Sequence, residues 1–241
     1  MIIDVLTLFP EAFCFLYNYS IIGKALENNI FTLKTINIRD FSKDKHKRVD
    51  DYPYGGGNGM ILKPEPLFEA IMSCKNINSH VIYLSPKGKL LNQDILKTLS
   101  KKEHLILISG HYEGIDNRIV ENYVDEEISI GDYVLTGGEI PSMVLIDSIV
   151  RLLPNVLSSV DSYEEESIYN GLLEYPQYTR PEVFKGKRVP RILLSGDHER
   201  IKKWRTINSL YLTIKNRPDL ISKFQLEDSI NDTLIKIIKS I

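Results

Sequence analysis

The chain has 241 residues, 43% of them apolar and 26% charged, with a formal net charge of −2. This composition is ordinary for a soluble globular protein, and the length allows one large domain or two modest ones. It excludes a protein that is basic throughout, and no apolar run reaches the roughly 18 residues that a membrane-spanning helix needs.

The first half of the chain alternates strand-like and helix-like segments. The strand-like runs are residues 2–8, 31–38, 80–84 and 104–108, followed less clearly by 127–130 and 133–135. The helix-like segments are residues 12–28, 66–73, 92–100, 116–121 and 141–153. Short, almost wholly apolar strands separated by helices predict an α/β fold, with a parallel sheet that helices cover on both faces.

The last of these helices is apolar nearly all round, which indicates burial in a core or at a subunit interface. Its polar exceptions include Asp147 and Arg151, which are one turn apart and therefore share a face. Pro154 ends the helix, and the sequence then loses its periodicity as far as about Asn170, which is typical of a linker.

Beyond the linker the chain looks helical. Asp197 is a plausible N-cap for a helix that ends at Pro218, and a short helix from about Leu226 closes the chain. We therefore predict an α/β domain over residues 1–158, a flexible interdomain linker over 159–172, and a smaller helical domain over 173–241.

The N-terminus and the cysteines indicate the compartment. Met1 to Asp4 lead straight into a strand-like pattern, without the basic flank and cleavage site of a signal peptide. Cys14 and Cys74 form no CxxC pair, so the pattern predicts neither a disulfide framework nor a zinc site. We expect a cytoplasmic protein in a reducing setting, with no membrane partner.

Two glycine-containing segments follow apolar runs and would place backbone groups around a cavity. They are residues 109–116 (SGHYEGID) and 130–141 (IGDYVLTGGEIP). Glycines at strand ends let the main chain approach a flat ligand closely, and Pro141 suits the first turn of a helix. The pattern predicts a nucleoside-type cofactor held by loops.

Familiar signatures of other chemistries do not occur in the sequence. It has no GxxxxGK[ST] phosphate loop, and its first strand leads into Phe9-Pro10-Glu11 instead of a glycine turn. No serine stands in a GxSxG elbow, and the five histidines show no metal spacing. Chemistry by positioning is therefore favoured, and methyl transfer from a sulfonium fits because that donor is already activated.

Charged residues are unevenly distributed along the chain. Residues 39–48 hold five Lys or Arg against two Asp, and residues 180–205 hold nine against three acids. Residues 113–132 reverse this balance, with seven acids against Arg118. A single charge run is usually a solvated face, but two basic blocks flanking an acidic, glycine-lined segment favour a nucleic-acid partner.

The glycine run at residues 55–59 (GGGNG) follows no strand and, taken alone, is typical of a flexible loop. Arg48, Asp50 and Asp51 precede it, so cationic and acceptor groups lie beside backbone that a base or a sugar can approach.

Four motifs, in order and at the expected spacing, resemble a known family. They are residues 50–57 (DDYPYGGG), 109–116, 130–141 and 171–181 (GLLEYPQYTRP). The chain resembles the bacterial tRNA (guanine-N1)-methyltransferases, which belong to the SPOUT class of trefoil-knotted proteins. The resemblance extends from Phe9 to at least Arg205, and several long motifs in register are more specific than any single one.

The resemblance implies an obligate homodimer of the bacterial cytoplasm, with a deep trefoil knot in its first domain. It implies methyl transfer from S-adenosylmethionine to N1 of the guanosine immediately 3′ of the tRNA anticodon (position 37), when another guanosine precedes it.

The implied S-adenosylmethionine pocket is formed by three loops: Tyr83, Leu84, Ser85 and Pro86; Gly110 and Glu113; and Ile130, Gly131, Asp132, Tyr133, Val134, Leu135, Gly137, Gly138 and Pro141. The implied contacts with the anticodon arm are Arg48, Asp50, Gly55, Gly56, Gly57, Gly59, Ser167 and Arg180. The family has been linked to Mg²⁺, for which the sequence offers no ligand cluster.

The resemblance also implies two catalytic residues. Guanine N1 carries a proton at neutral pH, so a carboxylate is needed as general base, and a cation can stabilise the negative charge that moves toward O6. The family's arginine matches Arg151. Its base is a linker aspartate followed by serine, and the residue before Ser167 is Glu166, which keeps a similar basicity but moves its reach by about one bond.

We predict Glu166 as the base, with Asp161 and Glu165 as alternatives; without the resemblance the acidic run would be read as a solvated linker. His111 stands where some relatives have an arginine. Two other functions stay open at this point. One is a non-catalytic RNA-binding protein on the same scaffold, and the other is a methyltransferase that acts on another RNA position.

Overall fold

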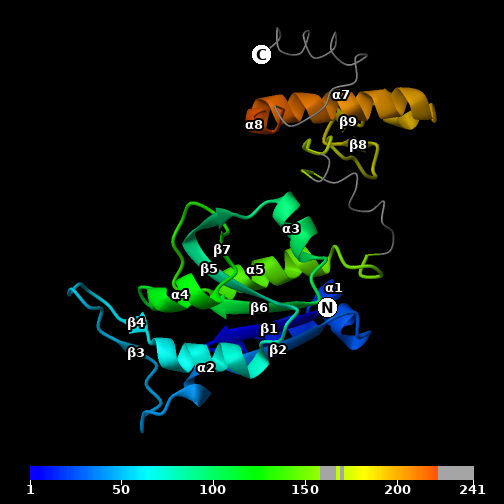
Figure 1. Ribbon diagram of the computed structural model, residues 1–241. Helices are drawn as coiled ribbons and strands as arrows, with labels where there is room; N and C mark the ends of the chain where they lie inside the picture. Colours follow the sequence, from blue (N-terminus) through cyan, green and yellow to red (C-terminus); the bar gives the residue numbers. More distant parts are fainter. Residues whose placement is uncertain (158–166, 169–170, 222–241) are drawn as a thin grey trace. The chain divides into compact units, whose positions relative to one another are not determined.

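The computed structural model describes residues 1–157, 167–168 and 171–221 (Figure 1). Contacts within the chain divide it into two compact units, Met1–Ser158 and Ser159–Ile241. In the described residues, no helix is long and apolar enough to cross a bilayer.

Five parallel strands form the sheet of the first unit, in the order β2-β1-β6-β5-β7. Their bounds are Ile2–Thr7 (β1), Thr32–Asn37 (β2), Ser79–Leu90 (β5), His104–Ser109 (β6) and Glu126–Ser129 (β7). β6 lies at the centre, and all six of its residues are buried. The continuous apolar run that predicted this strand reflects burial on both faces, and the predicted α/β class with a parallel sheet is confirmed.

Helices cover both faces of this sheet (Figure 1). Their bounds are Ser20–Glu27 (α1), Pro64–Cys74 (α2), Gln93–Leu99 (α3), Asn117–Tyr123 (α4) and Glu139–Val150 (α5). Successive side chains of β6 alternate between two cores, because Leu105 and Leu107 pack with α1, α3 and α5, whereas Ile106 and Ile108 pack with α2 and α4.

The predicted helix over residues 12–28 is wrong as a single element. A 3-10 helix, η1 (Pro10–Asn18), precedes α1, and a second short one, η2 (Ile38–Phe41), follows β2. Tyr19 is extended and Ser20 has a φ of +42°, a left-handed conformation that breaks the helical path between η1 and α1. The predicted helix over 141–153 is also shifted, since α5 begins at Glu139 and Arg151 is its C-cap; Pro141 still lies in the first turn.

Residues 133–135, predicted as strand-like, are irregular and exposed instead. β7 ends at Ser129, whose hydroxyl accepts a hydrogen bond from the Gly131 amide at 3.2 Å. Gly131 has a φ of +155°, and the turn that follows carries the chain away from the sheet.

β5 is much longer than its predicted core and pairs with β7 in two registers. Its first part places Leu84 beside Ile128, and its last part places Lys89 beside the same residue. Between the two registers the chain passes so close to β7 that a Cβ on Gly88 would collide with the peptide between Glu127 and Ile128. Glycine is therefore required at this close approach.

A two-stranded antiparallel ribbon of β3 (Asp50–Asp51) and β4 (Ile61–Leu62) flanks the glycine run and was not predicted. In the second unit the described elements are β8 (Val183–Phe184), β9 (Lys187–Arg188), η3 (Arg191–Leu194), α7 (His198–Asn216) and α8 (Pro218–Ile221). The predicted N-cap is confirmed, because Asp197 accepts a hydrogen bond from the Arg200 amide at 3.1 Å. The helix predicted from about residue 226 lies outside the described residues.

Candidate cofactor site and active site

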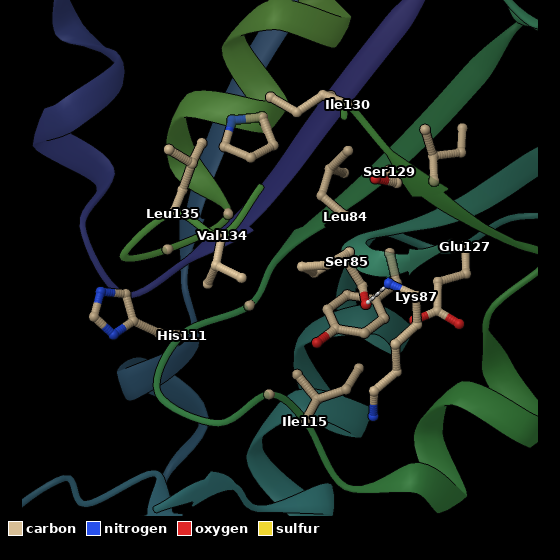
Figure 2. Close-up of a pocket in the computed structure, with 18 of the residues that line it drawn as sticks. Leu84, Ser85, Lys87, His111, Ile115, Glu127, Ser129, Ile130, Val134 and Leu135 are labelled. Atoms are coloured by element: carbon tan, nitrogen blue, oxygen red, sulfur yellow. Dashed lines mark hydrogen bonds between the residues drawn. The ribbon is translucent and has the colours of Figure 1, made fainter. Parts of the chain in front are cut away.

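A cavity of about 300 Å³ lies at the carboxyl ends of β5, β6 and β7 (Figure 2). Ligands of open α/β sheets bind at this edge, because the loops that follow the strands converge there. The volume is at the lower end of the range for small-molecule pockets.

Tyr83, within β5, fixes the loop that follows β6. Its ring lies so close to the chain that a Cβ on Gly110 would be 2.8 Å from the ring, and one on Gly114 would be 3.2 Å from the hydroxyl. Burial, and secondarily the Glu127 carboxylate, raise the pKa of Tyr83 to about 12. The phenol therefore stays protonated at neutral pH.

Backbone contacts join the two glycine loops. The Gly138 amide donates to the Gly110 carbonyl at 2.7 Å, and His111 and Gly137 form an isolated antiparallel bridge. A Cβ on Gly138 would lie 2.7 Å from the Gly110 nitrogen and from the Ser109 Cα. The loops can approach this closely only because glycine stands at the contact.

Side chains beneath the loops add two buried hydrogen bonds. The Thr7 hydroxyl donates to Glu139 at 2.8 Å, and the Ser109 and Ser142 hydroxyls lie 2.8 Å apart. These bonds tie the start of α5 to the ends of β1 and β6. The Nδ1 atom of His111 is buried without a hydrogen-bond partner among the described residues, and its ring packs 5.2 Å from that of Phe9.

The cavity has an apolar end and a polar end. Figure 2 shows Leu84, Ile130, Val134 and Leu135 gathered at one side, while Lys87 and Glu127 lie at the other. A flat apolar ring fits the first side, with open backbone groups at its edge, and a charged chain fits the second.

The structure brings nearly all of the predicted cofactor-binding residues together. The cavity is lined by Tyr83, Leu84, Ser85, Pro86, Gly110, Glu113, Ile130, Gly131, Tyr133, Val134, Leu135, Gly137, Gly138 and Pro141. Asp132 is exposed and does not line it. Five further lining residues lie within the predicted segments 109–116 and 130–141: His111, Tyr112, Gly114, Ile115 and Thr136. Lining residues outside the predicted segments are Lys87, Asn117, Val120, Glu127, Ile128 and Ser129. Several of these residues directly follow or precede a predicted segment, and this adjacency is the sequence feature that could have identified them as lining residues.

The predicted RNA-contact residues of the first unit surround the glycine run of residues 55–59. Arg48 is exposed and pairs with Asp44 at 2.9 Å, which holds the pKa of that carboxyl below its usual range. Asp50 lies in β3, and Gly55, Gly56, Gly57 and Gly59 all have positive φ. The Glu113 amide donates to the Met60 carbonyl at 3.0 Å, so the end of this run is fixed to a loop of the cavity.

The remaining predicted residues lie at the end of α5 and in the second unit. Arg151 is half-buried, and its amide donates to the Asp147 carbonyl at 3.2 Å. The Ser167 hydroxyl accepts from the Glu174 amide at 2.9 Å, and Arg180 is exposed. The predicted base Glu166 and its alternatives, Asp161 and Glu165, lie outside the described residues. In the part of the chain that the structure describes, no three His, Cys, Asp or Glu side chains gather as a metal site.

Comparison with known proteins gives the family. The sequence profile of the tRNA (guanine-1)-methyltransferase TrmD family matches residues 1–223. Proteins named tRNA (guanine-N(1)-)-methyltransferase include one from Clostridium botulinum (strain Kyoto / Type A2), 58% identical over 229 residues and 95% of each chain. Another, from Clostridium novyi (strain NT), is 57% identical over 227 residues, which are 94% of this chain and 93% of the relative. A third, from Clostridium kluyveri, is 55% identical over 93% of this chain and 91% of the relative. The chain belongs to the tRNA (guanine-1)-methyltransferase family.

Proposed function

We propose that the protein transfers a methyl group from S-adenosylmethionine to N1 of the guanosine immediately 3′ of the tRNA anticodon. The observation that carries this proposal is the cavity of backbone loops at the carboxyl edge of the sheet, in a chain that belongs to the tRNA (guanine-1)-methyltransferase family. Both the shape of the cavity and the chemistry of its lining support it.

The cavity fits S-adenosylmethionine at both ends. Glycines at Gly110, Gly137 and Gly138 keep side chains out of the space beside the backbone, where an adenine ring can meet main-chain groups. The carboxylates of Glu113 and Glu127 provide negative charge for a cationic ligand. Once bound, S-adenosylmethionine supplies a methyl group on a sulfonium, which is already activated for transfer.

The remaining chemistry falls to this chain's own side chains. Glu166 takes the proton from guanine N1, and Arg151 stabilises the negative charge that then moves toward O6. These roles follow the family resemblance; Arg151 is the C-cap of α5, at the opposite end of the helix from Pro141, which lines the cavity. The glycine run at residues 55–59, with Arg48 and Asp50 before it, contacts the RNA near the cavity.

The proposed fold includes the trefoil knot of the SPOUT class. The path of β5 is consistent with it: the strand pairs with β7 in two registers, and Gly88, between them, lies against the β7 backbone.

We further propose a homodimer, in the cytoplasm of a bacterium, that binds the anticodon arm through domains at residues 1–158 and 173–241, joined by a linker at 159–172. Exposed apolar residues of η1, α1 and α5, including Phe15 and Val144, support a subunit interface. The basic segments at residues 39–48 and 180–205 suit phosphate contacts, so tRNA binding should weaken steeply as salt rises.

One assay separates the alternatives. The full-length protein is incubated with S-adenosylmethionine carrying a labelled methyl group and with tRNA transcripts that have G or another base 3′ of the anticodon. Transfer only to the transcript with G supports the proposal. Transfer regardless of that base would overturn the site assignment, and tRNA binding without any transfer would identify a non-catalytic RNA-binding protein.

A further inference from the structure

Lys87 extends into the polar end of the cavity from the segment of β5 that lies between its two registers with β7. Its amide donates to the Ser85 hydroxyl at 3.1 Å, and this bond holds the backbone at the turn. Figure 2 shows the side chain reaching along the cavity wall toward Ile115, away from the apolar end.

Among the described residues that line the cavity, Lys87 is the one lysine or arginine. Within the described part of the chain, its ammonium group makes no hydrogen bond and no ion pair. Glu127 lies at the same end (Figure 2), so this end combines a carboxylate with an ammonium group that no described residue pairs.

The two ends of the cavity fix the direction in which a nucleoside ligand lies. The apolar side chains and open backbone of residues 130–138 receive the base, because charged groups there would lose hydration without compensation. The opposite end, with Lys87 and Glu127, therefore receives the chain attached to the ribose. For S-adenosylmethionine that chain ends in an ammonium and a carboxylate.

We propose that Lys87 binds the α-carboxylate of S-adenosylmethionine, an inference that depends on the proposed function. A ligand carboxylate placed beside Glu127 without a cation would be repelled, and the Lys87 ammonium offsets that repulsion through a charge-assisted hydrogen bond. Lys87 thus selects ligands with an intact amino-acid chain over nucleosides that lack one.

The test uses calorimetric titration of the full-length protein with three ligands. These are S-adenosylmethionine, decarboxylated S-adenosylmethionine, which keeps the sulfonium and the amine, and 5′-methylthioadenosine, which lacks the amino-acid chain. Lys87→Met, which keeps length but not charge, should raise the Kd for S-adenosylmethionine about tenfold, the scale of one charge-assisted hydrogen bond. The Kd values for the other two ligands should change less than about twofold.

Lys89→Met is the matched control, because Lys89 is an exposed lysine of the same strand that does not line the cavity. It should leave all three Kd values unchanged. Lys87→Arg should retain most of the affinity for S-adenosylmethionine, since it restores the positive charge.

An equal loss of affinity for S-adenosylmethionine and its decarboxylated form would overturn the proposal, as would no loss for either. Binding of 5′-methylthioadenosine reports whether the variant is folded. If the unaltered protein binds none of the three ligands, the proposed function itself fails. If the unaltered protein binds them and Lys87→Met changes the Kd values for S-adenosylmethionine and its decarboxylated form equally, only the role of Lys87 fails.

Discussion

The Gly138 amide donates to the Gly110 carbonyl at 2.7 Å, and this bond helps to join the loop that follows β6 to the start of α5. Both glycines line the cavity. Because the bond is between backbone atoms and is closely packed, the shape of the cavity at this point depends on the missing Cβ of Gly138 more than on any side chain.

Gly138→Ala should therefore be more damaging than Gly137→Ala. The new Cβ at 138 would lie 2.7 Å from two backbone atoms, whereas at 137 it would meet the side chains of Glu139 and His111, which can move. We expect Gly138→Ala to cost about 1–3 kcal/mol of unfolding free energy and more than tenfold in S-adenosylmethionine affinity, with smaller losses for Gly137→Ala. Urea unfolding and calorimetry measure both; equal effects of the two substitutions would contradict this packing argument.

Tyr83 makes the stability of the folded protein depend on pH. Its pKa is raised from 10.0 to about 12 in the folded protein, chiefly by burial. The stability linked to this shift is fully present below about pH 10 and is lost as pH rises toward about 12, because the unfolded chain releases a proton that the folded protein keeps. Tyr83→Phe should abolish this loss, which reaches about 2.7 kcal/mol, the value of two pKa units, only above about pH 12 and is about 1.4 kcal/mol at pH 11.

Urea unfolding at about pH 8.5 and pH 11 measures the Tyr83 effect as a difference between the two conditions. The exposed Tyr133, replaced by Phe, is the control, and it should lose as much stability on alkalinisation as the unaltered protein. If Tyr83→Phe loses that same amount, the buried phenol does not account for the pH dependence.

Glu166→Gln should abolish methyl transfer while keeping S-adenosylmethionine affinity, since an amide cannot take the proton from guanine N1. Glu166→Asp, which retains the carboxylate on a shorter chain, should keep measurable turnover. Single-turnover rates on saturating tRNA, with calorimetry for the cofactor, distinguish these effects. A fully active Glu166→Gln would transfer the role of base to Asp161 or Glu165.

Arg151→Ala should lower turnover much more than tRNA binding, because the guanidinium is needed when charge develops on O6. The expected loss in kcat is about a hundredfold, with a change in tRNA Kd below about threefold. Lys101→Ala, at an exposed lysine after α3, controls for the general loss of positive charge. Equal losses in binding and turnover would make Arg151 a structural residue.

The strands and the glycine loops could be predicted from the sequence because their signals are local. The apolar run of β6 matches the structure to within one residue, and the loop glycines stand where the backbone comes closest. By contrast, residues 133–135 have strand-forming side chains but no partner strand, since the chain turns away at Gly131.

The extension of β5 could not be predicted for a related reason. Its last residues pair with β7 in a second register, which depends on contacts between segments some forty positions apart in the sequence. Lys87 lies just before that register, outside any glycine motif, so its place in the cavity follows from tertiary structure alone. The same holds for Glu127, whose strand-like surroundings gave no sign of a ligand site.

The apolar surface of α5 provides a test of the proposed dimer. Ile140 and Val144 are 57% and 40% exposed, although the helix is apolar nearly all round, and α5 contacts η1, where Phe15 is 49% exposed. A monomer would leave these side chains in water, whereas a dimer interface of typical size would cover them.

Val144→Glu should therefore convert a dimer into a monomer, because a carboxylate buried at the interface without a partner is costly. Sedimentation velocity measures the change, and Met72→Glu, at an exposed apolar residue of α2, is the control that should stay dimeric. If both variants sediment as dimers, the subunits meet through another surface; if the unaltered protein is a monomer, the homodimer proposal is wrong.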